Sequence, residues 1–164
     1  YNVPVEMAET RYGIRVDEHS LHTDGAGAGE YRGGSGAVRV YRSMNENQTF
    51  TASFGRNKWP VWGAAGGKDG SVNYFQFIDA DGTVSEPMGI AARRVMNTND
   101  VVRMVTATGG GYGNPFKRPA EKVAMDVKNE YITVEQAKAD YGVLVDPETF
   151  KVLGLTEERQ KAEK

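Results

Sequence analysis

The chain has 164 residues, of which 39% are hydrophobic, and this allows one sizeable core and about one domain. Its formal net charge of -2 and the lack of a basic run argue against nucleic acid or an anionic membrane surface as a partner. Because the chain has no cysteine, disulfide bonds, thiolate metal sites and a cysteine nucleophile are excluded within it.

The chain begins Tyr1-Asn2-Val3-Pro4, with neither an initiator methionine nor the apolar core of a signal peptide. We therefore expect a processed or split polypeptide. No apolar stretch of the sequence approaches the length of a membrane span, and the expected compartment is the cytoplasm.

Glycine is frequent, with 20 residues, and its clusters indicate turns between short segments rich in β-branched and aromatic residues. The alternation in Tyr74–Ile78 is typical of a strand, and Asp81-Gly82 then predicts a tight hairpin turn. The predicted strands span residues 14–21, 37–42, 49–54, 74–78 and 101–106.

The pattern changes after Pro115 to one with helical spacing. Pro119 is placed to open a helix, because its fixed φ suits a first turn. The residues Val123, Val127 and Tyr131 then recur along one helical face. A first helix is therefore predicted here.

A second short helix is predicted after the first. Thr133 and Gln136 have the spacing of a capping box, and Gly142 supplies a left-handed stop. Residues 156–164 are charged with little apolar pattern, so we expect them to fray.

These elements together predict a mainly β fold. We expect an antiparallel β sandwich or barrel-like domain over residues 1–114, followed by one or two short C-terminal helices in residues 115–164. The helical tail is expected to pack on the β domain or on a partner subunit.

The segment from Asp24 to Gly36 has enough glycine to let backbone amides approach an anion, although a structural loop is the favoured interpretation. It contains no G-x-G-x-x-G register. Gly67-Lys68 does not belong to a phosphate-binding loop either, because Trp62 stands where the first glycine is required. Nucleotide binding by this chain alone is therefore not predicted.

A second cluster joins cations to two tryptophans and flexible backbone. Two interpretations stay open: a clamp for an anionic or planar ligand, and a loop at the edge of the core whose tryptophans pack against a neighbouring domain. The candidate site residues of this cluster are Arg56, Lys58, Trp59, Trp62, Gly66 and Gly67.

Residues 109–115 follow a predicted strand and precede the helical tail, a place where a sharp crossover from sheet to helix is one interpretation, although the site interpretation given below is preferred. At least one glycine between residues 109 and 113 is expected to have positive φ. In the alternative interpretation the loop lines a site and its exposed amides face an anionic intermediate. Gly110, Gly111 and Tyr112 are then further candidates for substrate or intermediate binding.

His19 and His22 lie in a segment predicted to be extended, where residues three apart point to opposite faces. No metal site is therefore predicted. Residues 79–82 match a calcium loop poorly, because the glycine comes two positions early and Ile90 stands where the bidentate glutamate belongs. No spacing in the sequence forms a nucleophile and base pair, so the catalytic residues stay unknown.

The order of several blocks resembles the C-terminal region of the hydantoinase B family. That family includes N-methylhydantoinase subunits, the corresponding half of 5-oxoprolinase, and the large catalytic subunits of acetone and acetophenone carboxylases. The chain departs from the family pattern where Gly55 precedes Arg56, since family members often have an acidic residue there. The blocks that carry the resemblance are residues 2–6, 11–12, 27–36, 62–67, 109–115 and 137–143.

The resemblance implies the C-terminal part, or a split subunit, of a heteromeric ATP-dependent enzyme that hydrolyses a cyclic amide. An ATP-dependent ketone carboxylase of the acetone or acetophenone type is the alternative. The implied partners are the remainder of a hydantoinase B-type subunit, a hydantoinase A-type subunit that binds ATP and Mg²⁺, and a small-molecule substrate. Any divalent metal would lie elsewhere in the complex, and the isolated chain would be inactive.

A rival interpretation is not enzymatic. The chain would then be a β-rich assembly module that bridges subunits, with Trp59 and Trp62 as interface anchors.

Overall fold

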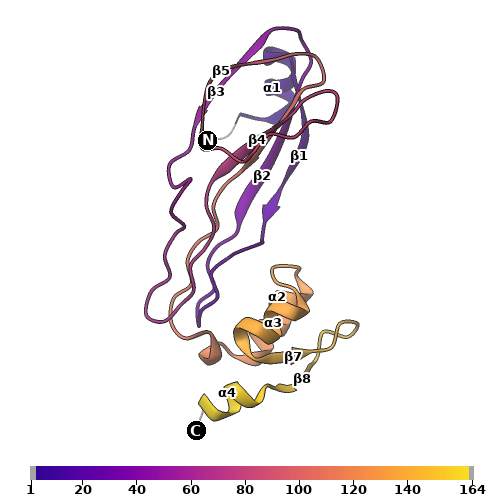
Figure 1. Ribbon diagram of the computed structural model, residues 1–164. Coiled ribbons are helices and arrows are strands. Elements are labelled where there is room, and N and C mark those ends of the chain that lie inside the picture. The colour runs from indigo at the N-terminus through magenta and orange to yellow at the C-terminus, as the bar shows by residue number, and fades with distance from the viewer. Residues whose placement is uncertain (1–2, 163–164) are drawn as a thin grey trace. The chain divides into compact units, whose positions relative to one another are not determined.

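The computed structural model describes residues 3–162 of the chain (Figure 1). These residues form two compact units, and the chain passes between them repeatedly. Within the described residues, unit 1 comprises 3–22, 37–59 and 72–106, and unit 2 comprises 23–36, 60–71 and 107–162. A domain boundary at residue 114, with the tail packed on the β domain or on a partner subunit, stays a prediction.

The described helices and strands are short and most of the strands lie in unit 1. That unit contains α1 (Val5–Tyr12), β1 (Ile14–His22), β2 (Gly36–Ser43), β3 (Gln48–Ser53), β4 (Tyr74–Ile78), β5 (Ile90–Met96) and β6 (Val101–Val105). Unit 2 contains η1 (Pro115–Lys117), α2 (Ala120–Lys128), α3 (Val134–Tyr141), β7 (Val143–Val145), β8 (Val152–Leu155) and α4 (Glu157–Ala162).

Antiparallel pairing dominates the sheets. One sheet has the order β1-β2-β6-β4, β3 pairs with β5, and β7 pairs with β8. The β2–β6, β4–β6, β3–β5 and β7–β8 pairs are all antiparallel. The predicted fold class, mainly β with C-terminal helices, is therefore confirmed.

The core of unit 1 lies where β3 and β5 meet the four-stranded sheet. Phe75 and Phe77 alternate with half-buried residues along β4, and both are almost fully buried. The ring of Phe50 on β3 meets them edge-on, with its centroid 5.8 Å from that of Phe75 and 5.4 Å from that of Phe77. Such edge-to-face contacts add favourable ring electrostatics to the burial of apolar area. The period of two in the sequence therefore identified the buried face.

Strand β5 is not among the predicted strands, because its Ile-Ala-Ala-Arg-Arg-Val-Met run lacks strand alternation. The β3–β5 register shifts between Phe50 and Ala52, and Arg93 has a φ of 53° at this irregularity. The Arg93 amide donates to Thr51 Oγ1 at 3.1 Å. A bulge of this kind breaks the period of two, so alternation alone does not reveal the strand.

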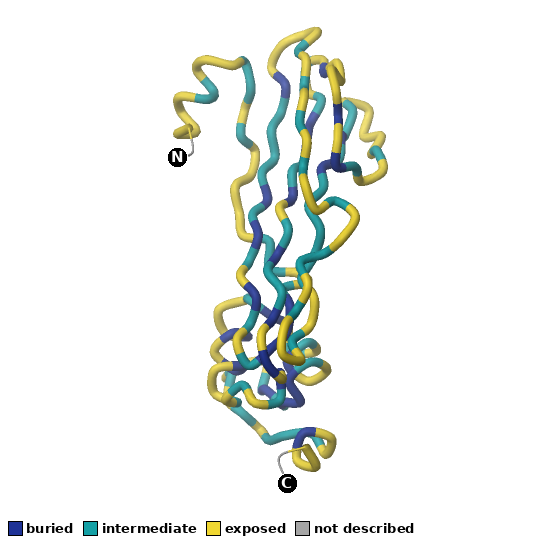
Figure 2. Tube along the Cα trace, turned by 90° about the vertical axis from the view of Figure 1, so that its left-hand side faces the viewer, coloured by how far each residue is buried: buried dark blue, intermediate teal, exposed yellow. Residues whose placement is uncertain are grey.

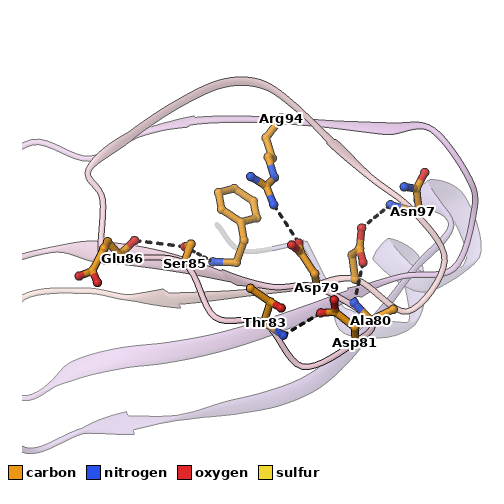
Figure 3. Close-up of polar contacts among 10 residues, drawn as sticks. Asp79, Ala80, Asp81, Thr83, Ser85, Glu86, Arg94 and Asn97 are labelled. Atoms are coloured by element: carbon orange, nitrogen blue, oxygen red, sulfur yellow. Dashed lines mark hydrogen bonds and ion pairs between the residues drawn. The ribbon is translucent and has the colours of Figure 1, made fainter.

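The turn after β4 is the predicted hairpin turn (Figure 3). Gly82 has a φ of 89°, and the Asp79 amide donates to the Thr83 carbonyl at 2.9 Å. The turn's carboxylates are engaged within the chain. Asp81 Oδ1 accepts from the Thr83 amide at 2.8 Å, and Asp79 pairs with Arg94 at 2.8 Å. The hydrogen bond from the Thr83 amide is the main cause that lowers the pKa of Asp81, and it helps to hold the turn closed.

Three glycine-rich loop segments of unit 2 pack with their backbones in direct contact, and we call them the glycine layer: residues 26–34, 61–70 and 107–113. A carbon added to Gly111 would lie 2.2 Å from the Ala28 carbonyl oxygen. One added to Gly67 would lie 2.2 Å from the Gly111 carbonyl oxygen. Both positions therefore require a residue without a side chain.

Main-chain hydrogen bonds join the segments of the glycine layer. The Lys68 amide donates to the Ala28 carbonyl at 2.7 Å, and the Gly111 amide donates to the Lys68 carbonyl at 2.9 Å. Gly113 ends the third segment with a φ of 77°, which confirms the prediction of a glycine with positive φ in this loop. The layer is therefore a backbone structure in which side chains point away or are absent.

The two predicted helices form in unit 2, although α2 ends at Lys128, so Tyr131, expected on its face, lies beyond it. Pro119 precedes α2, Thr133 and Gln136 form both bonds of the capping box at the start of α3, and Gly142 ends α3 with a φ of 63°. Burial raises the pKa of the Tyr141 hydroxyl in the core beneath the helices. This core contains Ala28, Val123, Ala124, Val127, Ile132, Ala137, Tyr141, Val143 and Val145.

The charged C-terminal segment forms α4, whereas the sequence predicts fraying there. Its Arg159 is buried, and the guanidinium donates to the Tyr141 carbonyl at 3.0 Å and to the Arg118 carbonyl at 2.9 Å. Backbone carbonyls thus hold this helix in place through a charged side chain. Hydrophobic periodicity does not reveal such an anchor, so the prediction of fraying was wrong for residues 157–162, while residues 163–164 lie outside the described part of the chain.

Asp126 of α2 is buried between two arginines. Its Oδ2 accepts from Arg118 Nε at 3.1 Å and lies 2.8 Å from Arg118 Nη2, and Arg32 Nε is 3.6 Å away. Arg118 also donates to the Glu30 carbonyl at 3.0 Å. One carboxylate therefore connects α2 to the glycine layer, which contains both Glu30 and Arg32.

We expect Gly111→Ala to lower the free energy of unfolding by about 1–3 kcal/mol or more, because the new methyl group meets backbone that cannot withdraw without breaking the layer. Urea denaturation measures this loss. Gly34→Ala is the matched control, since nothing lies within 4 Å of a carbon added there. The control is expected to be neutral or stabilising by up to about 1 kcal/mol. Equal losses for the two variants would contradict the packing described here.

Asp126→Asn is expected to lower the free energy of unfolding by about 3–5 kcal/mol, because it leaves buried guanidinium groups without a counter-charge. Thermal and urea denaturation at neutral pH would measure the change. Asp140→Asn serves as the control: it removes an ion pair with Lys68 whose side chains are 30% and 55% exposed, and at most about 1 kcal/mol is expected. A small effect of Asp126→Asn would mean that the cluster does not stabilise unit 2.

Candidate functional site

Two tyrosines stand on the glycine layer of unit 2. Tyr31 and Tyr112 form an antiparallel bridge in which each amide donates to the other residue's carbonyl, at 3.0 and 2.9 Å. Their ring centroids are 6.2 Å apart and their planes are inclined by 55°. Both residues remain exposed, at 63% and 57%. The backbone beneath the rings is thus fixed while the rings themselves stay accessible.

Trp62 belongs to the same layer. A carbon added to Gly110 would lie 2.2 Å from the Trp62 carbonyl oxygen, so these two backbones touch. Two residues further along, Ala64 forms a parallel bridge with Tyr112. Trp62 is 70% exposed. An indole and two phenols are therefore carried by segments that are bonded to one another.

The structure brings six of the predicted site residues into one unit. These six lie on the second and third segments of the glycine layer: Trp62, Gly66, Gly67, Gly110, Gly111 and Tyr112. Arg56, Lys58 and Trp59 belong to unit 1, where all three are exposed and Trp59 reaches 78%. Sequence proximity had joined these two groups into one cluster, which the fold divides between units.

Four of the five amides of the 109–113 loop are engaged inside unit 2. Those of Gly109, Gly111, Tyr112 and Gly113 donate to backbone carbonyls at 2.8–2.9 Å. They are therefore not free to face an anionic intermediate, as one interpretation of the sequence had it. Tyr112 is the one exposed residue of this loop, at 57%.

Three residues were not among the predicted site residues: Tyr31 and Lys68, which belong to the glycine layer, and Asp140 of α3, which is bonded to Lys68. Lys68 Nζ donates to Asp140 Oδ1, and this bond links the second glycine segment to α3. Tyr31 carried a signal, because it lies in a block of the family resemblance. Nothing in the sequence indicated that it pairs with Tyr112, since the two residues are far apart along the chain.

The histidines lie on β1, the extended segment that the sequence predicted. Arg39 Nη2 is 3.4 Å from His19 Nε2. Within residues 3–162 there is no group of three or more His, Cys, Asp or Glu side chains placed to hold a metal ion. No helix among the described residues is long and apolar enough to cross a membrane.

Unit 2 offers a ligand an aromatic surface on a fixed backbone. Aromatic faces can stack on a planar ligand, and the phenol hydroxyls of Tyr31 and Tyr112 can donate or accept hydrogen bonds. The Glu30 carboxylate lies close to Gly113, the residue after Tyr112, since a carbon added to that glycine would be 3.2 Å from Glu30 Oε2. The aromatic surface suits positioning of a substrate and exclusion of water.

Known proteins share sequence with this chain. A family model described as Hydantoinase B/oxoprolinase matches residues 1–115. The putative B-type component of a D-/L-hydantoinase from a Pseudomonas species is 32% identical over 146 residues, which are 88% of this chain and 24% of that protein.

Two solved structures share the fold. The ATP-dependent caprolactamase of Pseudomonas jessenii has a TM-score of 0.75 and 29% identity, over 97% of this chain and 27% of that one. A nucleotide-free acetone carboxylase has a TM-score of 0.74 at 17% identity, over 98% of this chain and 25% of that one, and at this identity it shows the fold alone.

The chain spans a quarter or less of the length of the curated relatives that it matches in sequence. The family match covers most of the chain, including all three segments of the glycine layer. The chain belongs to the hydantoinase B/oxoprolinase family.

Proposed function

We propose that this chain forms part of an ATP-dependent enzyme that hydrolyses a cyclic amide, as a C-terminal part or split subunit of hydantoinase B type. The observation that carries the proposal is the likeness to an ATP-dependent caprolactamase in both sequence and fold, because caprolactam is itself a cyclic amide. A polypeptide of this kind works in a complex. Two of the relatives support that, since each is named as one subunit, of a hydantoinase and of a caprolactamase respectively.

ATP and Mg²⁺ belong, in this proposal, to a partner subunit of hydantoinase A type. The glycine segments of this chain do not fit a nucleotide phosphate, because amides such as those of Gly27, Gly33 and Gly111 already donate to backbone carbonyls at 2.9 Å. Phosphate loops need such amides free and convergent. Any divalent metal lies elsewhere in the complex, in the remainder of the hydantoinase B-type subunit.

The role of unit 2 is to present Tyr112, Tyr31 and Trp62 to the substrate from an immobile floor. Fixed rings lose little conformational entropy when a planar cyclic amide stacks on them. The Tyr112 hydroxyl is in a position to bond a ring carbonyl or amide of the substrate. Arg56, Lys58 and Trp59 of unit 1 are proposed as separate candidates, since their exposed cations and indole suit an anionic intermediate.

Two alternatives have specific support. The family resemblance noted in the sequence, which extends to ketone carboxylases, keeps a ketone carboxylase as the second candidate. Exposure of both indoles, Trp59 at 78% and Trp62 at 70%, favours a bridging module that only assembles subunits. Copurification of a hydantoinase A-type chain with turnover of hydantoin would support the amidohydrolase, and assembly without turnover of amide or ketone would support the module.

The isolated 164-residue chain is expected to show no hydrolysis of ATP or hydantoin, because it has no phosphate loop and no paired nucleophile and base among its described residues. Turnover is measured with ATP, Mg²⁺ and hydantoin against a buffer control. The same assay on the assembled complex is the positive control. Activity of the chain alone above buffer would overturn the division of labour proposed here.

Tyr112→Phe is expected to lower kcat/KM of the assembled enzyme about tenfold or more with an unchanged melting temperature, because one hydrogen bond to the substrate is lost while the ring stays. Tyr12→Phe is the matched control, since Tyr12 is similarly exposed, at 55% against 57%, but lies on α1 of unit 1. Unchanged turnover for Tyr112→Phe would leave the 109–113 loop a structural crossover and remove it from the site.

A further inference from the structure

Unit 1 contains a hollow that the proposed function does not use. Its volume is about 820 Å³, and residues of α1, β1, β2, β3, β5 and β6 line it. Small-molecule sites in proteins usually enclose about 300–1,000 Å³ and are mostly apolar with a few polar groups. The apolar wall includes Ala8, Tyr12, Ile14, Val16, Phe50 and Met96.

The helix that closes one side of this hollow is unusual. None of the residues of α1 is buried, as Figure 2 shows at the N-terminal end of the described chain. An eight-residue helix gains little from its own hydrogen bonds and is normally held by packing of an apolar face. Its residues Val5, Ala8 and Tyr12 face the hollow. An occupant of the hollow would therefore also stabilise α1.

The cations that line the hollow differ in their partners. Arg42 is paired with Asp17 at 2.7 Å, and Arg15 beside them lies 2.6 Å from the same carboxylate. These two arginines, Arg15 first, lower the pKa of Asp17. Arg39, by contrast, contacts a phenol and an imidazole: it donates to the Tyr41 hydroxyl at 3.2 Å, and its Nη2 is 3.4 Å from His19 Nε2.

Among the described residues, Arg39 therefore has no carboxylate to balance its charge, although it is half-buried beside an apolar wall. Arg39 and Tyr41 are two apart on β2, so their side chains share one face of the sheet. A guanidinium in such a place prefers a carboxylate, which it can bind through two parallel hydrogen bonds. The hollow thus combines one anion-binding group with room for an apolar body.

We propose that this hollow binds a small carboxylic acid with an apolar body, with the carboxylate on Arg39 and the body between α1 and Phe50. Neither an amide ring nor ATP is required, so the proposal does not depend on the function proposed for unit 2. A small molecule fits better than a polypeptide segment, because the lining comes from six elements that surround a hollow of drug-like volume and offers one uncompensated cation.

The test compares 4-phenylbutyrate with 4-phenylbutan-1-ol, which has the same body and no charge. Each is titrated into the ¹⁵N-labelled 164-residue chain and followed by NMR. The acid is expected to bind about tenfold more tightly than the alcohol, because a charge-assisted pair is added to the same apolar contacts. The largest shifts are expected at His19, Arg39, Tyr41 and Phe50.

Arg39→Gln is expected to abolish the preference for the acid and to leave binding of the alcohol unchanged. Arg15→Gln is the matched control: it removes a neighbouring arginine that does not line the hollow, and Asp17 keeps Arg42 as its partner. This variant is expected to keep the tenfold preference. If Arg39→Gln does not fold, the comparison of acid and alcohol on the unaltered chain still decides.

Equal affinities for acid and alcohol, absence of binding, or shifts confined to residues outside the hollow would each overturn the proposal. A further arm distinguishes a polypeptide occupant. If the assembled complex no longer binds the acid while the isolated chain does, another part of the complex fills the hollow, and the small-acid proposal is wrong.

Discussion

Close contact between glycine backbones is the constraint on which unit 2 depends. Where Gly67, Gly111 and Ala28 meet, carbonyl oxygens occupy the space that side-chain carbons would need. Glycine loses more conformational entropy on folding than any other residue, so a glycine-rich layer is unfavourable unless its amides and carbonyls are paired. The bonds between Lys68, Ala28 and Gly111 supply that pairing. They also consume the amides that would otherwise attract an anion.

The helical part of unit 2 is tied to this layer by buried charge as well as by apolar packing. Ala28 alone contributes to the apolar core from the layer, since glycines have no side chain to offer. Arg118 compensates by reaching from the segment before α2 to both Asp126 and the Glu30 carbonyl. Buried ion pairs add little net stability over apolar packing, but they define one relative position of the groups they join. The glycine layer has little apolar surface, so its position against the helices depends on these ion pairs.

The sequence was informative where local chemistry decides the structure. Alternation gave β4, the capping box gave the start of α3, and Gly142 gave its end, because each depends on residues a few positions apart. β5 was missed because a bulge at Arg93 breaks the alternation, and α4 because carbonyls far along the chain hold Arg159. The pairing of Tyr31 with Tyr112 was not predicted for the same reason. The two residues are about half the chain apart, and their residue types do not indicate that they pair.

The same physics separates what the scaffold fixes from what it leaves free. Positions in the glycine layer are set by main-chain atoms, so their geometry does not depend on which side chains stand above them. Tyr112 and Trp62 project from that floor and are more than half exposed, so replacing them changes the surface offered to a ligand and leaves the floor in place. A scaffold of this kind suits a family whose members act on different small molecules. In the function proposed above, the exposed side chains would set ligand preference, while the glycines of this chain are required for the steric reason already given.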